Sequence, residues 1–136
     1  MTAEPGAPEL LREFVYTRAP YPQAHASTLV ELKSGTLAAA WFGGTGERNP
    51  DVEIWFARRG ARGWERPVAV ANGMQPGGPR LPTWNPVLFQ DPAGALHLFY
   101  KVGPSPAKWW GMVTQSTDGG TTWLPSTRGR TSPSPR

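Results

Sequence analysis

The sequence predicts an all-β fold built from two copies of one antiparallel sheet module. Three observations support this: an internal repeat at a fixed offset, short apolar segments bounded by turn residues, and a recurring turn that ends in Trp. A shift of 59 positions without gaps, the separation of Leu29 and Leu88, superimposes residues of similar kind. The other matched pairs are Gly35 with Gly94, Leu37 with Leu96, Gly44 with Gly103, Gly60 with Gly119, and Trp64 with Trp123.

Each copy contains the same order of short segments. Three apolar segments are separated by a Gly turn and then by a Gly/Pro-rich loop: residues 26–32, 36–42 and 51–58 in the first copy, and 86–91, 95–101 and 110–117 in the second. A fourth segment, residues 65–70, is readable in the first copy. Val52, Ile54 and Phe56 alternate with Glu53, Trp55 and Ala57, which is the period of a strand. Four antiparallel strands per module at a constant spacing are typical of a β-propeller blade.

The turn at residues 116–123, Ser-Thr-Asp-Gly-Gly-Thr-Thr-Trp, closes the second copy. Gly permits the positive φ of a tight turn, and short polar side chains bond to nearby amides. Asp118 is therefore expected to build the turn. It is not expected to bind calcium, because the other oxygen ligands of a calcium loop are missing. The absence of Cys excludes thiolate metal sites, and neither a metal nor a cofactor is expected.

Composition excludes several classes of protein. The net charge of +4 arises partly from arginines around the 58–66 turn, which fits a solvated hairpin tip better than a nucleic-acid surface. No apolar run approaches the roughly 20 residues that span a bilayer, and residues 1–8 do not resemble a signal peptide. No membrane partner is expected, and the cytoplasm is the expected location.

The length of 136 residues suits two modules with their ends. We interpret residues 1–13 as an N-terminal extension, 14–124 as about two blades, and 125–136 as a disordered Ser/Pro/Arg-rich tail. A propeller needs at least about four blades to close, so the chain is expected to be an N-terminal part of a larger ring. Its expected partners are the missing blades, or further copies that associate through exposed strand edges.

Antiparallel topology predicts that one rim of the blades gathers the polar residues. The first strand begins on the rim that also carries the loop between the second and third strands. Four stretches should therefore converge there: residues 21–27, 43–51, 80–86 and 102–110. Polar and aromatic groups in these stretches are His25, Glu47, Arg48, Asn49, Asp51, Asn85, Lys101, Trp109 and Trp110. Ligand sites typically combine a few polar groups with aromatic walls.

The motif Ser-x-Asp-x-Gly-x-Thr-Trp at residues 116–123 matches the Asp box, or bacterial neuraminidase repeat, at every defined position. Residues 21–30 and 35–44 resemble the first two strands of the sialidase family. Residues 84–89 and 99–106 are similar to a sialidase-like group of exoglycosidases. The resemblance covers about residues 14–124 and implies a six-bladed β-propeller that hydrolyses terminal, sialic-acid-like sugar linkages.

This resemblance also implies residue roles. The family uses a Tyr nucleophile with a Glu partner, an acid/base Asp and three Arg residues that bind the substrate carboxylate. Asp51 stands at the start of the third strand, where the family places its acid/base, although a strand-initiating Asp after Pro50 is the alternative. His25, the second catalytic candidate, stands where the first Arg is expected, which departs from the pattern. A neutral His there would hydrogen-bond a sugar or shuttle a proton, and the alternative is a strand-end polar residue bonded to a nearby backbone group. The nucleophile is expected in blades outside this chain, so the chain alone should be inactive.

The remaining candidates are expected to bind a sugar. Asn85, Lys101 and Arg48 would bond to hydroxyls or a carboxylate, and Trp84 and Trp110 would stack on a ring. Packing between blades is the commoner use of such Trp residues, and Lys101 also fits a strand end with its charge in solvent. Arg18 and Arg80 lie near the starts of the innermost strands as further cations. The alternative function is a non-catalytic propeller that binds carbohydrate or protein.

Overall fold

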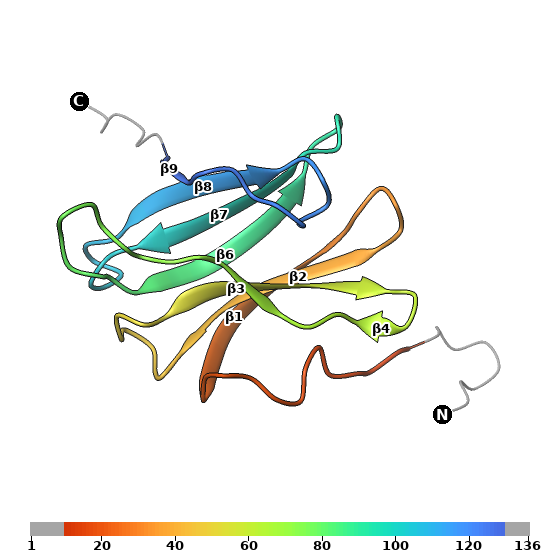
Figure 1. The fold of residues 1–136 in the computed structure, drawn as a ribbon, viewed down its shortest axis with the longest axis horizontal. Coiled ribbons are helices and arrows are strands. Elements are labelled where there is room, and N and C mark those ends of the chain that lie inside the picture. The colour runs from red at the N-terminus through yellow and green to blue at the C-terminus, as the bar shows by residue number, and fades with distance from the viewer. Residues whose placement is uncertain (1–9, 130–136) are drawn as a thin grey trace.

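The computed structural model describes residues 10–129, which form two antiparallel sheets and contain no helix (Figure 1). The first sheet consists of β1 (Gln23–Glu31), β2 (Leu37–Gly44), β3 (Glu53–Gly60), β4 (Gly63–Trp64) and β5 (Val68–Ala71). The second consists of β6 (Thr83–Gln90), β7 (Leu96–Val102), β8 (Trp110–Ser116) and β9 (Thr127–Arg128). The strands of each sheet follow one another in chain order, except that β4 and β5 both pair with β3. The all-β prediction is confirmed.

The repeat of 59 residues holds in the first two strands of each sheet. Leu29 pairs with Ala39 in the first sheet, and Leu88 pairs with Leu98 in the second. A β-bulge interrupts both β1 and β6 at the same place, where Ala26 (φ 55°) and Asn85 (φ 41°) adopt left-handed backbone. A bulge re-aims the strand that carries it. The two modules thus share an irregularity that the sequence pattern does not reveal.

The repeat changes offset at the third strand. Leu37 lies opposite Arg59, whereas Leu96 lies opposite Ser116, so the offset there is 57 (116 − 59). The matches of Gly60 with Gly119 and of Trp64 with Trp123 are therefore wrong as structural equivalences. Trp64 packs in a cluster with Trp41, whereas Trp123 packs in the core between the sheets. The loop before β8 is shorter than the loop before β3, since Val102 pairs with Trp110 whereas Gly43 pairs with Glu53. The longer turn after β8 then brings the offset back to 59 at Trp123 without structural equivalence.

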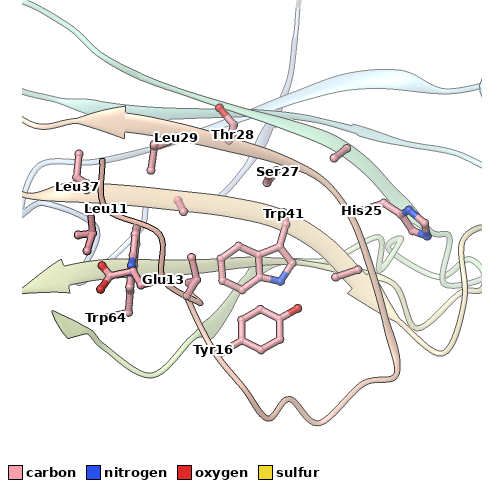
Figure 2. Close-up of a pocket in the computed structure, with 14 residues that line it drawn as sticks. Leu11, Glu13, Tyr16, His25, Ser27, Thr28, Leu29, Leu37, Trp41 and Trp64 are labelled. Carbon is pink, nitrogen blue, oxygen red and sulfur yellow. The ribbon is translucent and has the colours of Figure 1, made fainter. Parts of the chain in front are cut away.

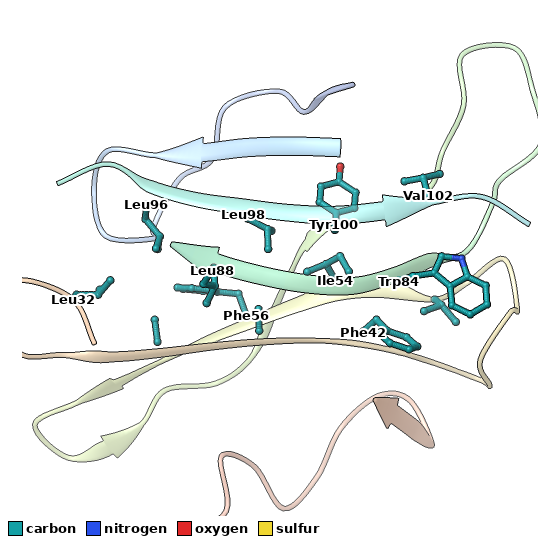
Figure 3. Packing of buried hydrophobic residues seen from close by; sticks show 13 residues of the cluster. Leu32, Phe42, Ile54, Phe56, Trp84, Leu88, Leu96, Leu98, Tyr100 and Val102 are labelled. Carbon is teal, nitrogen blue, oxygen red and sulfur yellow. The ribbon is translucent and has the colours of Figure 1, made fainter. Parts of the chain in front are cut away.

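The core lies between the two sheets, with β6 across β1, β2 and β3 (Figure 3). The first sheet contributes one face of small and aromatic residues, and the second contributes a row of larger aliphatic ones. The buried members are Leu32, Ala38, Ala40, Phe42, Val52, Ile54, Phe56, Trp84, Leu88, Leu96, Leu98, Tyr100 and Val102. Arg58 adds a polar link, because its guanidinium donates to the Gly119 carbonyl (3.2 Å) and to Thr121 Oγ1 (3.1 Å).

Matched positions of the two sheets are buried to different degrees. Leu88 is 6% exposed in the core, whereas Leu29 is 62% exposed. Leu29 and Leu88 lie on equivalent faces of the two sheets. The face that carries Leu88 packs on the first sheet, whereas no sheet among residues 10–129 packs on the face that carries Leu29. On the first sheet, residues 10–22 cover part of this face, and the rings of Tyr16 and Trp41 stack at 5.3 Å.

The turn at residues 116–123 is organised by two side chains. Ser116 Oγ, which is buried, accepts from the Gly120 amide at 2.8 Å and donates to Asp118 at 2.7 Å. Asp118 also accepts from the Thr122 amide at 2.9 Å and from the Thr122 hydroxyl. Asp118 therefore builds the turn, as its sequence context predicts.

We expect Asp118→Asn to weaken the dependence of stability on acid. The hydroxyl and amide of Thr122, with the Ser116 hydroxyl, hold the pKa of Asp118 far below its usual range. A carboxyl whose pKa is lowered on folding stabilises the fold above its unfolded pKa, about 3.9, and loses this contribution as the pH falls further. Urea denaturation between pH 7 and pH 2 should show a smaller loss in the variant. The free energy of unfolding of the variant should still fall at low pH, because the hydrogen bond to His97 also lowers the pKa of Asp91. An equal loss of unfolding free energy in the variant and in the unmodified chain would contradict the prediction.

The segment from residue 125 was expected to be disordered, and its described part corrects that expectation. Thr127 and Arg128 form β9, which pairs with Val113 and Met112 of β8. The strand completes a fourth position in the second sheet. Residues 130–136 of the expected tail lie outside the described residues, as do residues 1–9 of the N-terminal extension.

Candidate functional site

The four stretches expected at one rim do meet there. Gln23 pairs with Gly44, and the Thr83 hydroxyl donates to the Val52 carbonyl at 2.8 Å. The Gly103 amide donates to the carbonyl of Pro82 at 3.2 Å. The starts of β1, β3, β6 and β8 and the ends of β2 and β7 therefore share one edge of the molecule. This edge, called the rim below, comprises residues 21–27, 43–53, 80–86 and 102–110.

Asp51 organises the loop that leads into β3. Its carboxylate accepts from the Thr45 amide (3.2 Å to each oxygen) and from the Thr45 hydroxyl (3.0 Å). Asn49 donates in turn to Thr45 Oγ1 at 2.9 Å. A Cβ on Gly44 would lie 2.9 Å from Asp51 Oδ1, so the carboxylate rests directly against the backbone. The acid/base role remains a prediction, and the observed contacts give Asp51 a structural role in the loop.

His25 lies at the rim end of β1 and is exposed. Its ring packs at 5.7 Å from the Phe42 ring. It also lines the end of a cavity of about 540 Å³ on the first sheet, with Trp41, Tyr16 and Leu29 along its length (Figure 2). The cavity that His25 lines thus runs along a sheet face rather than across the rim.

Three other candidates stand on separate elements. Asn85 is exposed within the β6 bulge, and Arg48 is exposed in the loop before β3 with left-handed backbone (φ 75°). Lys101 is half-buried near the end of β7, two residues after Phe99 on the same face. All three belong to the rim or its border, so their binding roles remain predictions.

The two Trp candidates do not both present a free ring. Trp84 is 2% exposed in the core, and its indole nitrogen donates to the Gly103 carbonyl at 2.9 Å. Its ring packs against Phe42 and Trp109. Trp84 therefore packs between the blades, and the sugar-stacking role is corrected. Trp110 is half-buried, and the Arg128 guanidinium lies 4.8 Å from its ring centre, so one face of the ring is occupied.

Sequence reasoning missed an ion pair that joins the two blades at the rim. Arg80 precedes β6 and its guanidinium lies 3.6 Å from Glu53 of β3; both side chains are about one-third exposed. Arg80 Nε is buried and has no hydrogen-bond partner. The sequence indicates Arg80 as a cation near the start of β6, whereas Glu53 is one position of an alternating strand and has no predicted partner. No local pattern links residues so far apart in sequence.

Tyr21 is the other rim residue with a perturbed environment. Its hydroxyl accepts from the Trp41 indole nitrogen at 2.6 Å, and its ring packs on Trp55. Burial raises the pKa of Tyr21 above its usual range. The phenol is therefore neutral and acts as a packing and hydrogen-bonding group that fixes residues 10–22 on the first sheet.

Residues 10–129 bear on two further features, a metal site and a membrane-spanning helix. No three His, Asp or Glu side chains in this range lie close enough together to hold a metal ion. In the same range there is no helix of the length and apolar character needed to cross a membrane.

The geometry defines a class of protein: an incomplete β-propeller with an Asp-box turn at residues 116–123, whose blades are antiparallel sheets stacked face to face. Residues 35–135 match the BNR repeat-like domain family. The chain therefore belongs to the BNR repeat-like domain family. No curated protein matches the sequence at a significant level.

Solved structures that share this fold include two that are each 17% identical to this chain. The Hadza microbial sialidase Hz136 is 17% identical with a TM-score of 0.66, over 77% of this chain and 25% of that one. A protein of unknown function from Dyadobacter fermentans DSM 18053 is 17% identical with a TM-score of 0.58, over 76% of this chain and 35% of that one. The chain thus spans about a quarter and a third of their lengths, and the likeness at this identity concerns the fold.

Proposed function

We propose that this chain supplies part of the substrate-binding rim of a sialidase-like glycoside hydrolase that acts on terminal acidic sugars. The observation that carries the proposal is the Arg80–Glu53 pair, which places a guanidinium on the rim where the two blades meet. The carboxylate of Asp51 lies on the same rim, two residues before Glu53. The fold shared with a microbial sialidase supports the same substrate class.

Arg80 is suited to bind the carboxylate of an acidic sugar. A guanidinium binds a carboxylate through two parallel N–H bonds. The Arg80 side chain is 35% exposed, and Glu53 engages its terminal nitrogen Nη2 at the long distance of 3.6 Å. A substrate carboxylate would compete with Glu53 for this fork. Glu53 then limits the affinity of the rim for anions when no substrate is bound.

Asp51 would act in the chemical step of this proposal. In its protonated form it would give its proton to the leaving glycosidic oxygen as the bond to the anomeric carbon breaks. The nucleophile that attacks the anomeric carbon would come from a blade outside these 136 residues. For this role Asp51 would have to exchange its bonds with Thr45 for a bond to the substrate.

We expect the 136-residue chain to bind sialic acid weakly and to hydrolyse no aryl glycoside. NMR titration should show binding that Arg80→Gln weakens about tenfold, because a charge-assisted bond contributes about 1.5 kcal/mol or more. Glu53→Gln should leave binding equal or stronger. Arg62→Gln, at the exposed tip between β3 and β4, is the matched control. Equal affinity for a neutral sugar, or no effect of Arg80→Gln, would refute the assignment. Turnover by this chain alone would refute the need for further blades.

One observation favours a second function, a non-catalytic rim that binds sugar or protein. The Asp51 carboxylate already accepts three bonds from Thr45, which fits a residue that shapes a loop. The substitution Asp51→Asn distinguishes the two functions when it is made in a longer protein that also contains the remaining blades. Loss of turnover with sugar binding retained supports the hydrolase. Unchanged turnover eliminates Asp51 as the acid/base, and absence of turnover in the unmodified product favours the binding protein.

A further inference from the structure

A second cavity, of about 460 Å³, lies in the cleft between the two blades. One wall consists of the end of β5 and the connection that follows it, residues 70–76, and the other is the segment after the Asp-box turn, residues 123–126. Its floor includes the core residues Tyr100 and Val102 of β7, which are 3% and 1% exposed (Figure 3). The volume is comparable with that of small-molecule sites. Both walls of this cavity, called the interblade cavity below, belong to the described residues.

Hydrogen bonds fix each wall of the interblade cavity. On one wall, Asn72 Oδ1 accepts from the Met74 amide at 3.0 Å. On the other, the Leu124 amide donates to the Gln115 carbonyl of β8 at 2.9 Å. A site whose walls are ordered before the ligand arrives loses less conformational entropy on binding. The interblade cavity is therefore preformed.

Large apolar side chains lie on both walls of the interblade cavity. Met74 and Leu124, on opposite walls, are 60% and 53% exposed. Met112 and Trp123 also line the cavity and are half-buried. The Trp123 indole nitrogen donates to the Gly120 carbonyl at 3.1 Å, so the ring contributes apolar surface to the lining. Exposed apolar side chains around a concave surface are typical of a binding site.

The lining of the interblade cavity contains hydrogen-bonding groups but no charged group. None of the described residues that line it is Asp, Glu, Lys, Arg or His. Its polar side chains are those of Asn72, Gln75, Tyr100 and Ser126. Burial raises the pKa of Tyr100 above its usual range, so the phenol is neutral. A charged ligand would lose water there without gaining a counter-charge, which is unfavourable. The lining therefore selects a neutral ligand.

The two amide side chains keep one hydrogen-bonding group each for a ligand. Asn72 uses its oxygen within the wall, and Gln75 uses its nitrogen, which donates to the Gly73 carbonyl at 3.1 Å. The donor Nδ2 of Asn72 and the acceptor Oε1 of Gln75 take no part in these bonds. The wall thus offers one donor and one acceptor.

We propose that the interblade cavity binds a neutral sugar ring, at a site separate from the rim. A sugar ring has an apolar face of C–H groups, which suits Trp123 and Met112, and an edge of hydroxyl groups, which suits the two amides and the Tyr100 hydroxyl. A wholly apolar ligand would bury these polar groups without partners, which is unfavourable. The proposal does not rest on the hydrolase function proposed for the rim.

An NMR titration of the 136-residue chain with lactose tests the proposal. The ε-methyl signals of Met74 and Met112 and the indole N–H signal of Trp123 should shift. The indole signals of Trp84 and Trp109, which lie at the rim, should not. Sialic acid should leave the three cavity signals unchanged, because the lining offers no cation. Each site is read from its own signals, so the failure of one proposal leaves the other intact.

Three substitutions locate the bound sugar. Tyr100→Phe keeps the ring and should weaken lactose binding about fivefold, the effect of losing one neutral hydrogen bond. Leu124→Ala should weaken it about threefold through lost apolar contact. The matched control is Leu29→Ala, because Leu29 is 62% exposed and does not line the interblade cavity. Its affinity for lactose should equal that of the unmodified chain, as should the affinity of Arg80→Gln.

Four results would overturn the proposal. The first is the absence of shifts at Met112 and Trp123 up to the solubility limit of lactose. The second is an equal response of these signals to sialic acid. The third is unchanged affinity in both Tyr100→Phe and Leu124→Ala, or a loss of lactose binding in Arg80→Gln, which would place the sugar at the rim. The fourth is a response to benzyl alcohol but not to lactose, which would assign the cavity to an apolar ligand.

Discussion

Gly120→Ala should be among the most destabilising single substitutions in this chain. Gly120 has a φ of 95°, and a Cβ there would lie 2.4 Å from Phe56 Cζ in the core. Left-handed backbone at a residue other than Gly costs on the order of 1–3 kcal/mol. Forcing the Phe56 ring aside adds about 1–3 kcal/mol. The loss should appear in urea denaturation as a lower midpoint with an unchanged slope.

Gly119→Ala separates the two contributions. Gly119 also has a positive φ, 73°, but a Cβ there would meet only Arg58 Nη1, at 3.6 Å. This variant should therefore show the backbone cost without the steric one. Equal destabilisation by the two substitutions would mean that the steric contact with Phe56 contributes nothing to the loss of unfolding free energy. Phe56→Leu in the Gly120→Ala background should recover part of the lost stability, because it removes the ring that the methyl group meets.

Leu88→Ala should lower the free energy of unfolding by about 2–5 kcal/mol, the cost of deleting a buried Leu side chain and leaving a cavity. Leu88 is 6% exposed and belongs to the core between the sheets. The same substitution at the matched position of the first sheet is the control. Leu29→Ala should cost about 0.5 kcal/mol or less at concentrations where the chain is a monomer, because Leu29 is largely exposed.

This comparison tests the stacking order of the two modules. Residues at the same place in a repeat should differ in energetic weight only because one face has a neighbour. Urea denaturation of both variants at low and high protein concentration gives the measurement. Equal losses for Leu29→Ala and Leu88→Ala in the monomer would mean that the two faces are covered alike, contrary to the structure.

The repeat made much of the fold predictable from sequence. The first two strands of each module appear at the expected positions, since Leu29, Leu37, Leu88 and Leu96 keep the offset of 59. The third strand does not follow it, because the loop before it is two residues shorter in the second module: Gly43 pairs with Glu53, whereas the matched Val102 pairs with Trp110. A gap-free shift cannot detect a change in turn length. It therefore paired Trp64 with Trp123, which belong to different clusters.

The rim was predictable as a place but not as a set of contacts. Alternation and turns locate the ends of strands, so the convergence of the four stretches followed from topology. The partners followed from three-dimensional packing: Glu53 meets Arg80 from another blade, and Asp51 turns toward Thr45. Trp84 was open to two uses from sequence, since a Trp near a rim suits both stacking on a sugar and packing between blades. Burial decided in favour of packing.

The position of β6 across three strands of the first sheet has a consequence for synthesis on the ribosome. The first sheet is complete once residue 71 has emerged, yet Ile54 and Phe56 then have no cover. They remain accessible to water, and to any chaperone nearby, until the next strand arrives. Nascent chains with such uncovered surface are prone to aggregate. The short link of residues 72–82 keeps that interval brief, since the strand that seals the sheet leaves the exit tunnel directly afterwards.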